Sequence, residues 1–338
     1  MKDNKHHGGD LGWAINHFGL SEEEWIDLST GINQSSYPFD LKENFNVNAL
    51  PSKALYDACL SASGSYFNAR LTPSNTLLTP GSQFIISQLP HLFAPDEIAI
   101  LYPTYGEHVP AWKEAGHKVH LVRNIDEALA LNSKFILLVN PNNPDGKLYS
   151  QSELLKISNQ QASRGGYLVI DEAFIDISSE ESLSDYAGQE GLIILRSFGK
   201  FFGLAGIRLG TLLAPQDIIE RLQRRLGPWA VSSITLAVAT QAYQDQEWID
   251  RQKTNLSKSS EKIDRLFSAV GCDIVGGTIL YRLYHTESAS TLFNHLGQKG
   301  IYLRHFEYNP NWLRVGVPDI HNELLWQRLE NALSDFHS

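Results

Sequence analysis

The middle of the chain alternates short aliphatic runs with longer amphipathic stretches, between residues 98 and 226. This alternation is typical of a parallel sheet whose crossover connections are helices. The predicted strands are Ile98–Leu101, Val119–Val122, Phe135–Val139, Tyr167–Ile170, Leu192–Leu195 and Leu209–Ala214. The predicted helices are Tyr105–Ala115, Ile125–Leu131, Gln151–Ser163 and Pro215–Leu226. We therefore expect an α/β fold, with a mostly parallel sheet flanked by helices.

The last third of the chain has a different pattern. A long helical pattern runs from Ser232 to Phe267 and is interrupted near Asp245. Strands are predicted at Ile279–Leu283, Ile301–Arg304 and Trp312–Val315, and helices at Ser290–Lys299 and Asn322–Phe336. We expect a large α/β domain over 46–235 and a smaller α+β domain over 236–338. Residues 1–45, with an amphipathic turn over Leu11–Phe18 ended by Gly19, are predicted to form an N-terminal arm that is part of the small domain.

Charge and composition exclude several classes of protein. The 28 basic and 38 acidic side chains give a net charge of −10, without a Lys/Arg stripe that would attract nucleic acid. No apolar run approaches the roughly 20 residues that cross a bilayer, and the N-terminus lacks a signal peptide's apolar core. Two cysteines do not make a disulfide framework. We expect a soluble cytoplasmic enzyme that binds neither nucleic acid nor membrane.

Polar segments directly follow three of the predicted strands, where ligands bind in open α/β sheets. These segments are Asn140–Gly146, Asp171–Phe174 and Arg196–Lys200. Each taken alone is also compatible with an ordinary turn, a helix cap or a solvated loop lysine. The occurrence of all three segments in this order favours a ligand-binding site at the carboxyl edge of the sheet.

Together with Ser197–Arg208, these segments resemble the fold type I, aminotransferase-like enzymes that use pyridoxal 5′-phosphate. The most specific signal is Lys200 followed eight residues later by Arg208, and the resemblance extends from His7 to Val317. The glycines after Gly199 form no dinucleotide-binding or P-loop motif, and the twelve histidines show no metal-ligand spacing. A pyridoxal-phosphate site is therefore the preferred interpretation, with no metal.

Side-chain chemistry supports the cofactor roles that this resemblance implies. The amine of Lys200 suits a Schiff base with the cofactor's aldehyde, and the carboxylate of Asp171 suits its protonated pyridine nitrogen. The amide of Asn143 suits the ring oxygen. Tyr105 matches the position whose ring stacks on the cofactor, although it is also compatible with a core aromatic residue.

The cofactor's phosphate needs backbone N–H groups at a helix N-terminus and a forked cation. Gly81, Ser82 and Gln83 open an amphipathic stretch and are expected to provide the N–H groups. Arg208 and the hydroxyl of Ser197 are expected to complete the phosphate site.

The N-terminal segments His7–Leu11 and Trp25–Asn33 resemble the arm of the threonine-phosphate decarboxylases of cobalamin biosynthesis. In that family the arm covers the active site, which implies substrate contacts for His7, Gly8, Gly9 and Asn33. Phe174, where many aminotransferases carry a tyrosine, agrees with the decarboxylase pattern. Leu50-Pro51 stands where histidinol-phosphate aminotransferases have Tyr-Pro, a departure that weakens the aminotransferase alternative.

The substrate implied by this resemblance is L-threonine O-3-phosphate, which has two anionic ends. Arg304 and Arg314 match family positions that contact substrate, as does Asn143, and arginine suits forked recognition of carboxylate and phosphate. Either arginine is also compatible with an ordinary surface position. Arg196 and Arg282 are interpreted as structural.

The predicted reaction is decarboxylation to (R)-1-aminopropan-2-yl phosphate by a homodimer. The alternative is an aminotransferase of the histidinol-phosphate type, which shares the cofactor residues. Which bond at Cα breaks depends on geometry that the residues alone do not show. A non-enzymatic regulator is disfavoured, because no DNA-binding helix-turn-helix segment precedes the cofactor-binding region.

Overall fold

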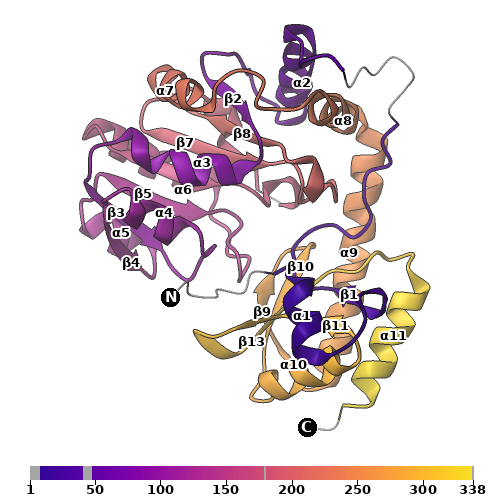
Figure 1. The fold of residues 1–338 in the computed structure, drawn as a ribbon. Helices are drawn as coiled ribbons and strands as arrows, with labels where there is room; N and C mark the ends of the chain where they lie inside the picture. The colour runs from indigo at the N-terminus through magenta and orange to yellow at the C-terminus, as the bar shows by residue number, and fades with distance from the viewer. Residues whose placement is uncertain (1–7, 41–47, 179, 337–338) are drawn as a thin grey trace. The chain divides into compact units, whose positions relative to one another are not determined.

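The computed structural model describes residues 8–40, 48–178 and 180–336 (Figure 1). The chain divides into two compact units. The larger unit contains Tyr37–Asn143 and Lys147–Gln246. Of the described residues, the smaller unit combines 8–36 with Pro144–Gly146 and 247–336. The division into residues 1–45, 46–235 and 236–338 stays a prediction.

A seven-stranded sheet forms the centre of the larger unit, in the order β2-β8-β7-β6-β5-β3-β4. Neighbours from β7 to β4 pair in parallel, whereas β8 is antiparallel to both β7 and β2. This confirms the expectation of an α/β fold with a mostly parallel sheet. The strands are β2 (Thr76–Thr79), β3 (Glu97–Leu101), β4 (Lys118–Val122), β5 (Phe135–Val139), β6 (Tyr167–Asp171), β7 (Leu192–Ser197) and β8 (Gly210–Leu213).

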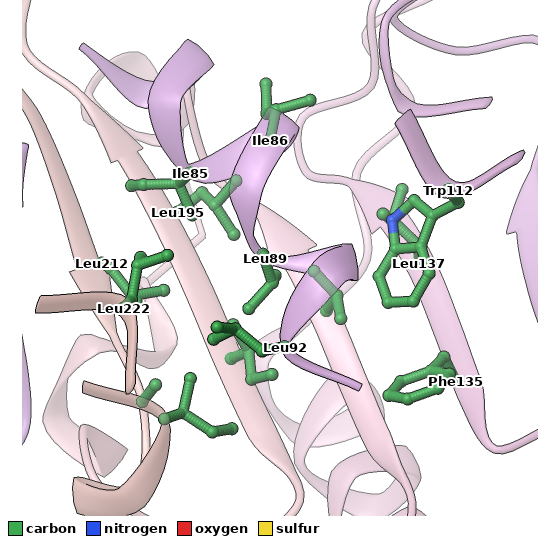
Figure 2. Close-up of a cluster of buried hydrophobic side chains, with 14 of the residues drawn as sticks. Ile85, Ile86, Leu89, Leu92, Trp112, Phe135, Leu137, Leu195, Leu212 and Leu222 are labelled. Atoms are coloured by element: carbon green, nitrogen blue, oxygen red, sulfur yellow. The ribbon is translucent and has the colours of Figure 1, made fainter. Parts of the chain in front are cut away.

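Helices cover both faces of this sheet. The helices of the larger unit are α2 (Lys53–Tyr66), α3 (Ser82–Gln88), α4 (His108–Glu114), α5 (Ile125–Ala130), α6 (Gln151–Ser163), α7 (Gln216–Leu226) and α8 (Ser233–Gln244). Side chains alternate between the faces along each strand. Val169 and Leu195 accordingly pack in a core cluster with α3, α4 and α7, whereas Ile170 and Ile194 pack with α6. In Figure 2, Ile85 and Ile86 of α3 and Leu89, which follows this helix, lie over the strands on the first of these faces.

Local sequence signals explain several helix ends. Ser150 and Glu153 form the predicted capping box of α6, with the Ser150 N–H donating to Oε2 of Glu153 at 2.9 Å. The prediction that a helix begins at Tyr105 was wrong, because α4 begins at His108. Tyr105 lies in the loop after Pro103, and its ring is therefore placed by the loop and not by the helix.

The smaller unit contains a four-stranded antiparallel sheet in the order β12-β13-β10-β9 and a parallel pair, β1 with β11. The strands are β1 (Ile26–Asp27), β9 (Asp273–Gly277), β10 (Tyr281–His285), β11 (Ile301–Tyr302), β12 (Arg304–Phe306) and β13 (Asn309–Gly316). The helices are α1 (Leu11–Phe18), α9 (Gln246–Ala269), α10 (Ala289–Gln298) and α11 (Glu323–Ser334). The single strand predicted over Ile301–Arg304 is in fact two strands in different sheets.

The N-terminal residues are integrated into the smaller unit. Helix α1 ends as predicted at Gly19, whose φ of 77° lies in the left-handed region and whose N–H donates to the carbonyl of Ile15 at 2.8 Å. Strand β1 then pairs with β11, so residues near both ends of the chain share one sheet. The described part of the chain contains no helix long and apolar enough to cross a membrane.

Short 3-10 helices occupy Glu22–Glu24, Pro90–Leu92, Ile175–Ile177, Leu183–Tyr186 and Ala205–Ile207.

Candidate active site

The polar segments predicted to form the site meet at one edge of the larger unit's sheet. Asp171 is the last residue of β6 and lies in register with Val139 of β5 and with Leu195 of β7. The N–H of Asn140 donates to the carbonyl oxygen of Asp171 at 2.9 Å. The sheet therefore places the ends of these three strands side by side, as the sequence predicted.

Asp171 is buried, and both of its carboxylate oxygens have partners. The residue is 3% exposed, its Oδ1 accepts the Ala173 N–H at 3.0 Å, and its Oδ2 lies 3.0 Å from Nε2 of His108. His108 itself is 1% exposed. Because an ionised carboxylate only accepts hydrogen bonds, the contact favours the ring form that carries a proton on Nε2. These two contacts thus hold the Asp171 carboxylate in one orientation inside the protein.

His108 is a site residue that the sequence analysis missed. It lies in α4, 63 positions before Asp171, and no motif in the sequence connects the two residues. Its spacing of three residues after Tyr105 is the only local signal. This spacing allows the two rings to pack in a T-shaped arrangement, with their centroids 5.8 Å apart.

Tyr105 and Gln83, both predicted cofactor residues, contact each other. The Tyr105 hydroxyl donates to Oε1 of Gln83 at 3.4 Å. Gln83 lies in the first turn of α3, so this contact joins the loop before α4 to the beginning of α3. Because His108 contacts both Tyr105 and Asp171, these contacts connect Gln83 and Tyr105 with Asp171.

Close backbone approach brings together the residues predicted to bind phosphate. Thr79, Gly210 and Ser197 lie in register across β2, β8 and β7. A Cβ atom on Gly210 would lie 2.3 Å from the nitrogen of Ser82, so only glycine permits this packing of β8 against α3.

Gly81, the residue before α3, has a φ of 79°, in the region that favours glycine. A Cβ atom there would lie 2.4 Å from Nη2 of Arg208. The guanidinium of Arg208 is therefore seated against the beginning of α3. Arg208 itself has a left-handed φ of 57°, uncommon for a residue other than glycine.

Lys200 lies in the turn that follows β7 and is half-buried. Its Nζ is 5.8 Å from the centroid of the Phe174 ring, which follows β6 three residues after Asp171. Asn143 is half-buried in the segment after β5. The adjacent Asn142 anchors that segment, since its Nδ2 donates to the carbonyl of Pro103 at 3.0 Å.

In the smaller unit, Arg304 of β12 lies directly opposite Arg314 of β13. Arg314 is 7% exposed, and its Nη2 donates to the Ser29 carbonyl at 2.6 Å. Burial lowers the pKa of Arg314 to about 10 and also lowers the pKa of Arg304. Like charges directly opposite in a strand pair destabilise it, and a bound anion would relieve both effects.

The N-terminal glycines pack on the same arginine. The Gly9 N–H donates to Oγ of Ser29 at 2.7 Å. A Cβ atom on Gly8 would lie 2.4 Å from the Ser29 carbonyl oxygen and 3.3 Å from Nη2 of Arg314. Gly8, Gly9 and Arg314 therefore converge on Ser29, a residue to which the sequence analysis gave no role.

Asn33 makes a different set of contacts. It is buried, and its Oδ1 accepts the Ser35 N–H at 3.0 Å and the Gln252 amide at 3.1 Å. These bonds tie the N-terminal segment to α9. His7, also predicted to contact substrate, lies outside the described residues.

The two arginines interpreted as structural make ion pairs. Arg282 binds Asp264 at 2.9 Å, and Arg196 is buried beside Asp176 and Glu172. Within the described ranges, no group of three or more His, Cys, Asp or Glu side chains could hold a metal ion.

The model of the family described as aminotransferase class I and II matches residues 24–330. The chain belongs to this family. Its aminotransferase-like fold recurs in the histidinol-phosphate aminotransferase of Clostridium acetobutylicum, with a TM-score of 0.80, 19% identity and coverage of 91% of this chain and 99% of that one. The L-threonine-O-3-phosphate decarboxylase of Porphyromonas gingivalis gives a TM-score of 0.75, 21% identity and coverage of 91% and 98%.

Within this aminotransferase family, the chain is 37% identical to a threonine-phosphate decarboxylase of Pseudomonas aeruginosa, over 98% of this chain and 97% of that protein. A protein of the same name from a Sinorhizobium species is also 37% identical, over 97% of both chains. The histidinol-phosphate aminotransferase of Pyrococcus furiosus is 29% identical over 69% of both chains. Similarity to the decarboxylases is thus higher and extends further along the chain.

Proposed function

We propose that this chain is a pyridoxal-phosphate-dependent lyase that decarboxylates L-threonine O-3-phosphate to (R)-1-aminopropan-2-yl phosphate, a step of cobalamin biosynthesis. The observation that carries the proposal is the 37% identity, over 98% of the chain, to a protein named threonine-phosphate decarboxylase. The facing pair Arg304 and Arg314 supports it, because a substrate with a carboxylate and a phosphate needs two well-placed cations.

The residues of the larger unit fit the cofactor. The Gly81 backbone leaves room beside the guanidinium of Arg208, and N–H groups at the beginning of α3 can join that cation around a phosphate. The buried carboxylate of Asp171 suits a cationic ring nitrogen, and the ring of Tyr105 suits stacking on a planar ring. Lys200, at the end of β7, provides the amine for the cofactor's aldehyde.

When bound, pyridoxal phosphate withdraws electrons from the bonds at the substrate's α carbon, which weakens them. Asp171, oriented by His108 and by the Ala173 N–H, holds the proton on the ring nitrogen that makes this withdrawal possible. Burial of Asp171 strengthens the attraction between its carboxylate and the protonated ring nitrogen, because little water is present to screen the charges.

The arginines determine which bond is broken. Arg304 and Arg314 bind the anionic ends of the substrate and so orient its carboxylate. The bond from Cα to the carboxylate carbon then breaks, CO₂ leaves, and the Lys200 ammonium group would donate a proton to Cα in place of the lost carboxylate. An aminotransferase would instead present the Cα–H bond for cleavage.

We also propose that the enzyme acts in the cytoplasm as a homodimer. Cys59 and Cys272 are buried free thiols, which fits a reducing compartment. In the larger unit, Leu50 is 63% exposed and Trp229 is 60% exposed, and a second copy of the chain would cover such apolar side chains.

Product analysis tests the proposed reaction. Purified protein loaded with pyridoxal phosphate is expected to release CO₂ from phosphothreonine without 2-oxoglutarate. Phosphoserine and histidinol phosphate serve as comparison substrates. Turnover of histidinol phosphate that requires 2-oxoglutarate, without CO₂ from phosphothreonine, would overturn the proposal in favour of an aminotransferase.

A further inference from the structure

A second set of charged residues lies beside the candidate site, on the opposite face of the sheet. Glu172 follows Asp171, and its N–H continues the pairing with β7 by donating to the Leu195 carbonyl at 2.8 Å. Arg196 of β7 precedes Ser197 and lies four residues before Lys200. Because side chains alternate along a strand, Glu172 and Arg196 project to the face covered by α6, away from the face of Asp171.

Arg196 connects several chain segments at once. Its Nη2 contacts Oδ1 of Asp176 at 2.5 Å, and its Nη1 donates to the hydroxyls of Ser182 at 3.1 Å and Ser184 at 3.0 Å. Its guanidinium lies 4.0 Å from the centroid of the Phe67 ring, within cation–π distance.

Glu172 joins the same network. Its Oε2 accepts the Ser182 hydroxyl at 2.5 Å and lies 3.7 Å from Nη1 of Arg196. Its Oε1 accepts the Leu183 N–H at 3.1 Å. Glu172 is 0% exposed and Arg196 4% exposed, so neither charge is hydrated and each depends on its partners.

These contacts connect the end of β6 with the end of β7. Glu172 directly follows Asp171 at the end of β6. Arg196, in β7, precedes the turn that contains Lys200. A guanidinium can bind Asp176, Ser182 and Ser184 together because its donors form a rigid fork. Lysine presents a single ammonium on a flexible stem and cannot bridge the same groups with that geometry.

We propose that Arg196 and Glu172 are positioning residues of the active site, which fix the Asp171 carboxylate and the Lys200 turn relative to each other from the opposite face of the sheet. This inference rests on the proposed function, because it assigns Asp171 and Lys200 to the cofactor. A displacement of about 1 Å at reacting groups is sufficient to slow a reaction by about 10²-fold.

Arg196→Lys tests the inference, because it keeps the charge and loses the fork. For folded Arg196→Lys we expect kcat to fall about 10- to 100-fold while KM for phosphothreonine changes less than about twofold. The pH midpoint of the bound cofactor's absorbance is expected to move from the wild-type value, because the acid and the lysine then contact the cofactor differently. A structural role alone would lower the melting temperature and leave that midpoint unchanged.

Arg282→Lys is the matched control, since it removes the fork of another arginine–carboxylate pair, with Asp264 in the smaller unit. It is expected to leave the midpoint and kcat at wild-type values.

If Arg196→Lys does not fold, Glu172→Gln replaces it under the same criteria, because glutamine keeps the shape and an acceptor for the Leu183 N–H. A folded variant with the wild-type midpoint and kcat overturns the inference. Wild-type protein that binds no pyridoxal phosphate would instead overturn the proposed function.

Discussion

At the scale of single residues, the chemistry of this protein depends on what surrounds each side chain. Asp171 has both carboxylate oxygens engaged, one by a backbone N–H and one by His108. Arg314 has a pKa lowered to about 10 by burial, and an anionic ligand would stabilise its charged form. These environments turn common residue types into candidates for specific roles.

Lys200→Ala tests the most specific of these roles. We expect the variant to lose covalent attachment of the cofactor, so that borohydride no longer fixes pyridoxal phosphate to the protein. Turnover should fall by roughly 10³-fold or more, because the same amine is proposed to move a proton at Cα. Mass spectrometry of the reduced protein provides the measurement.

Lys156→Ala, at an exposed position on α6, is the control and should be labelled like wild type. Labelling of Lys200→Ala at a different lysine, with activity retained, would contradict the assignment.

The sequence predicted the residues that carry distinctive chemistry and missed those that act through a partner. Lys200, Arg208 and Asp171 stand in motifs, and the structure places each at the end of a strand or beside α3. His108 and Ser29 act through hydrogen bonds to residues 63 and 285 positions away. No local motif marks either residue, so only the fold identifies the partner.

At the scale of secondary-structure elements, the candidate phosphate site depends on how closely β8 approaches α3. The contact is between backbones, at Gly210 and Ser82, and a flexible side chain cannot move away to relieve it. The antiparallel β8 thereby places Arg208, two residues before it, next to Gly81.

Gly210→Ala is expected to weaken binding of pyridoxal phosphate by about tenfold or more, because its Cβ would lie 2.3 Å from the Ser82 nitrogen and displace the beginning of α3. Titration of the apoprotein with cofactor, followed by absorbance, gives the dissociation constant.

Gly206→Ala is the matched control, since a Cβ atom on Gly206 meets nothing within 4 Å. Equal affinities of the two variants would contradict the proposed role of this close approach.

Strands with uninterrupted apolar runs were predicted well, and β5 matches its predicted bounds, Phe135–Val139. Strands β2 and β9 were not predicted. The first is only four residues long with threonine at both ends, and the second ends in two glycines, so neither shows a clear period. Their pairing with β8 and β10 supplies the stability that their own sequences do not indicate.

At the scale of the whole molecule, each of the two units has its own buried cysteine. Cys59 lies in α2 of the larger unit, and Cys272 precedes β9 of the smaller unit. Burial raises the pKa of both thiols to about 11 from an ordinary value near 9. An unfolded chain therefore releases these protons at a lower pH than the folded protein does.

The free energy of unfolding is accordingly expected to fall as the pH rises from 9 towards 11, and this contribution is fully present only below pH 9. Each thiol should account for about 1 kcal/mol between pH 9 and pH 10. Denaturant unfolding of wild type and of a Cys59→Ala, Cys272→Ala variant over this range measures the difference in slope. Parallel pH profiles for the two proteins would contradict the prediction.

The sequence by itself determined the fold class and the family and proposed the candidate site residues, because aliphatic periodicity and short motifs are local properties of the chain. Only the tertiary structure decided that Gly8 and Gly9 meet Arg314 at Ser29, that His108 orients Asp171, and that Arg196 binds Glu172 and Asp176. These contacts join segments far apart in the chain. Their geometry follows from strand order and register, and from the packing of helices on the sheets, which no single segment encodes.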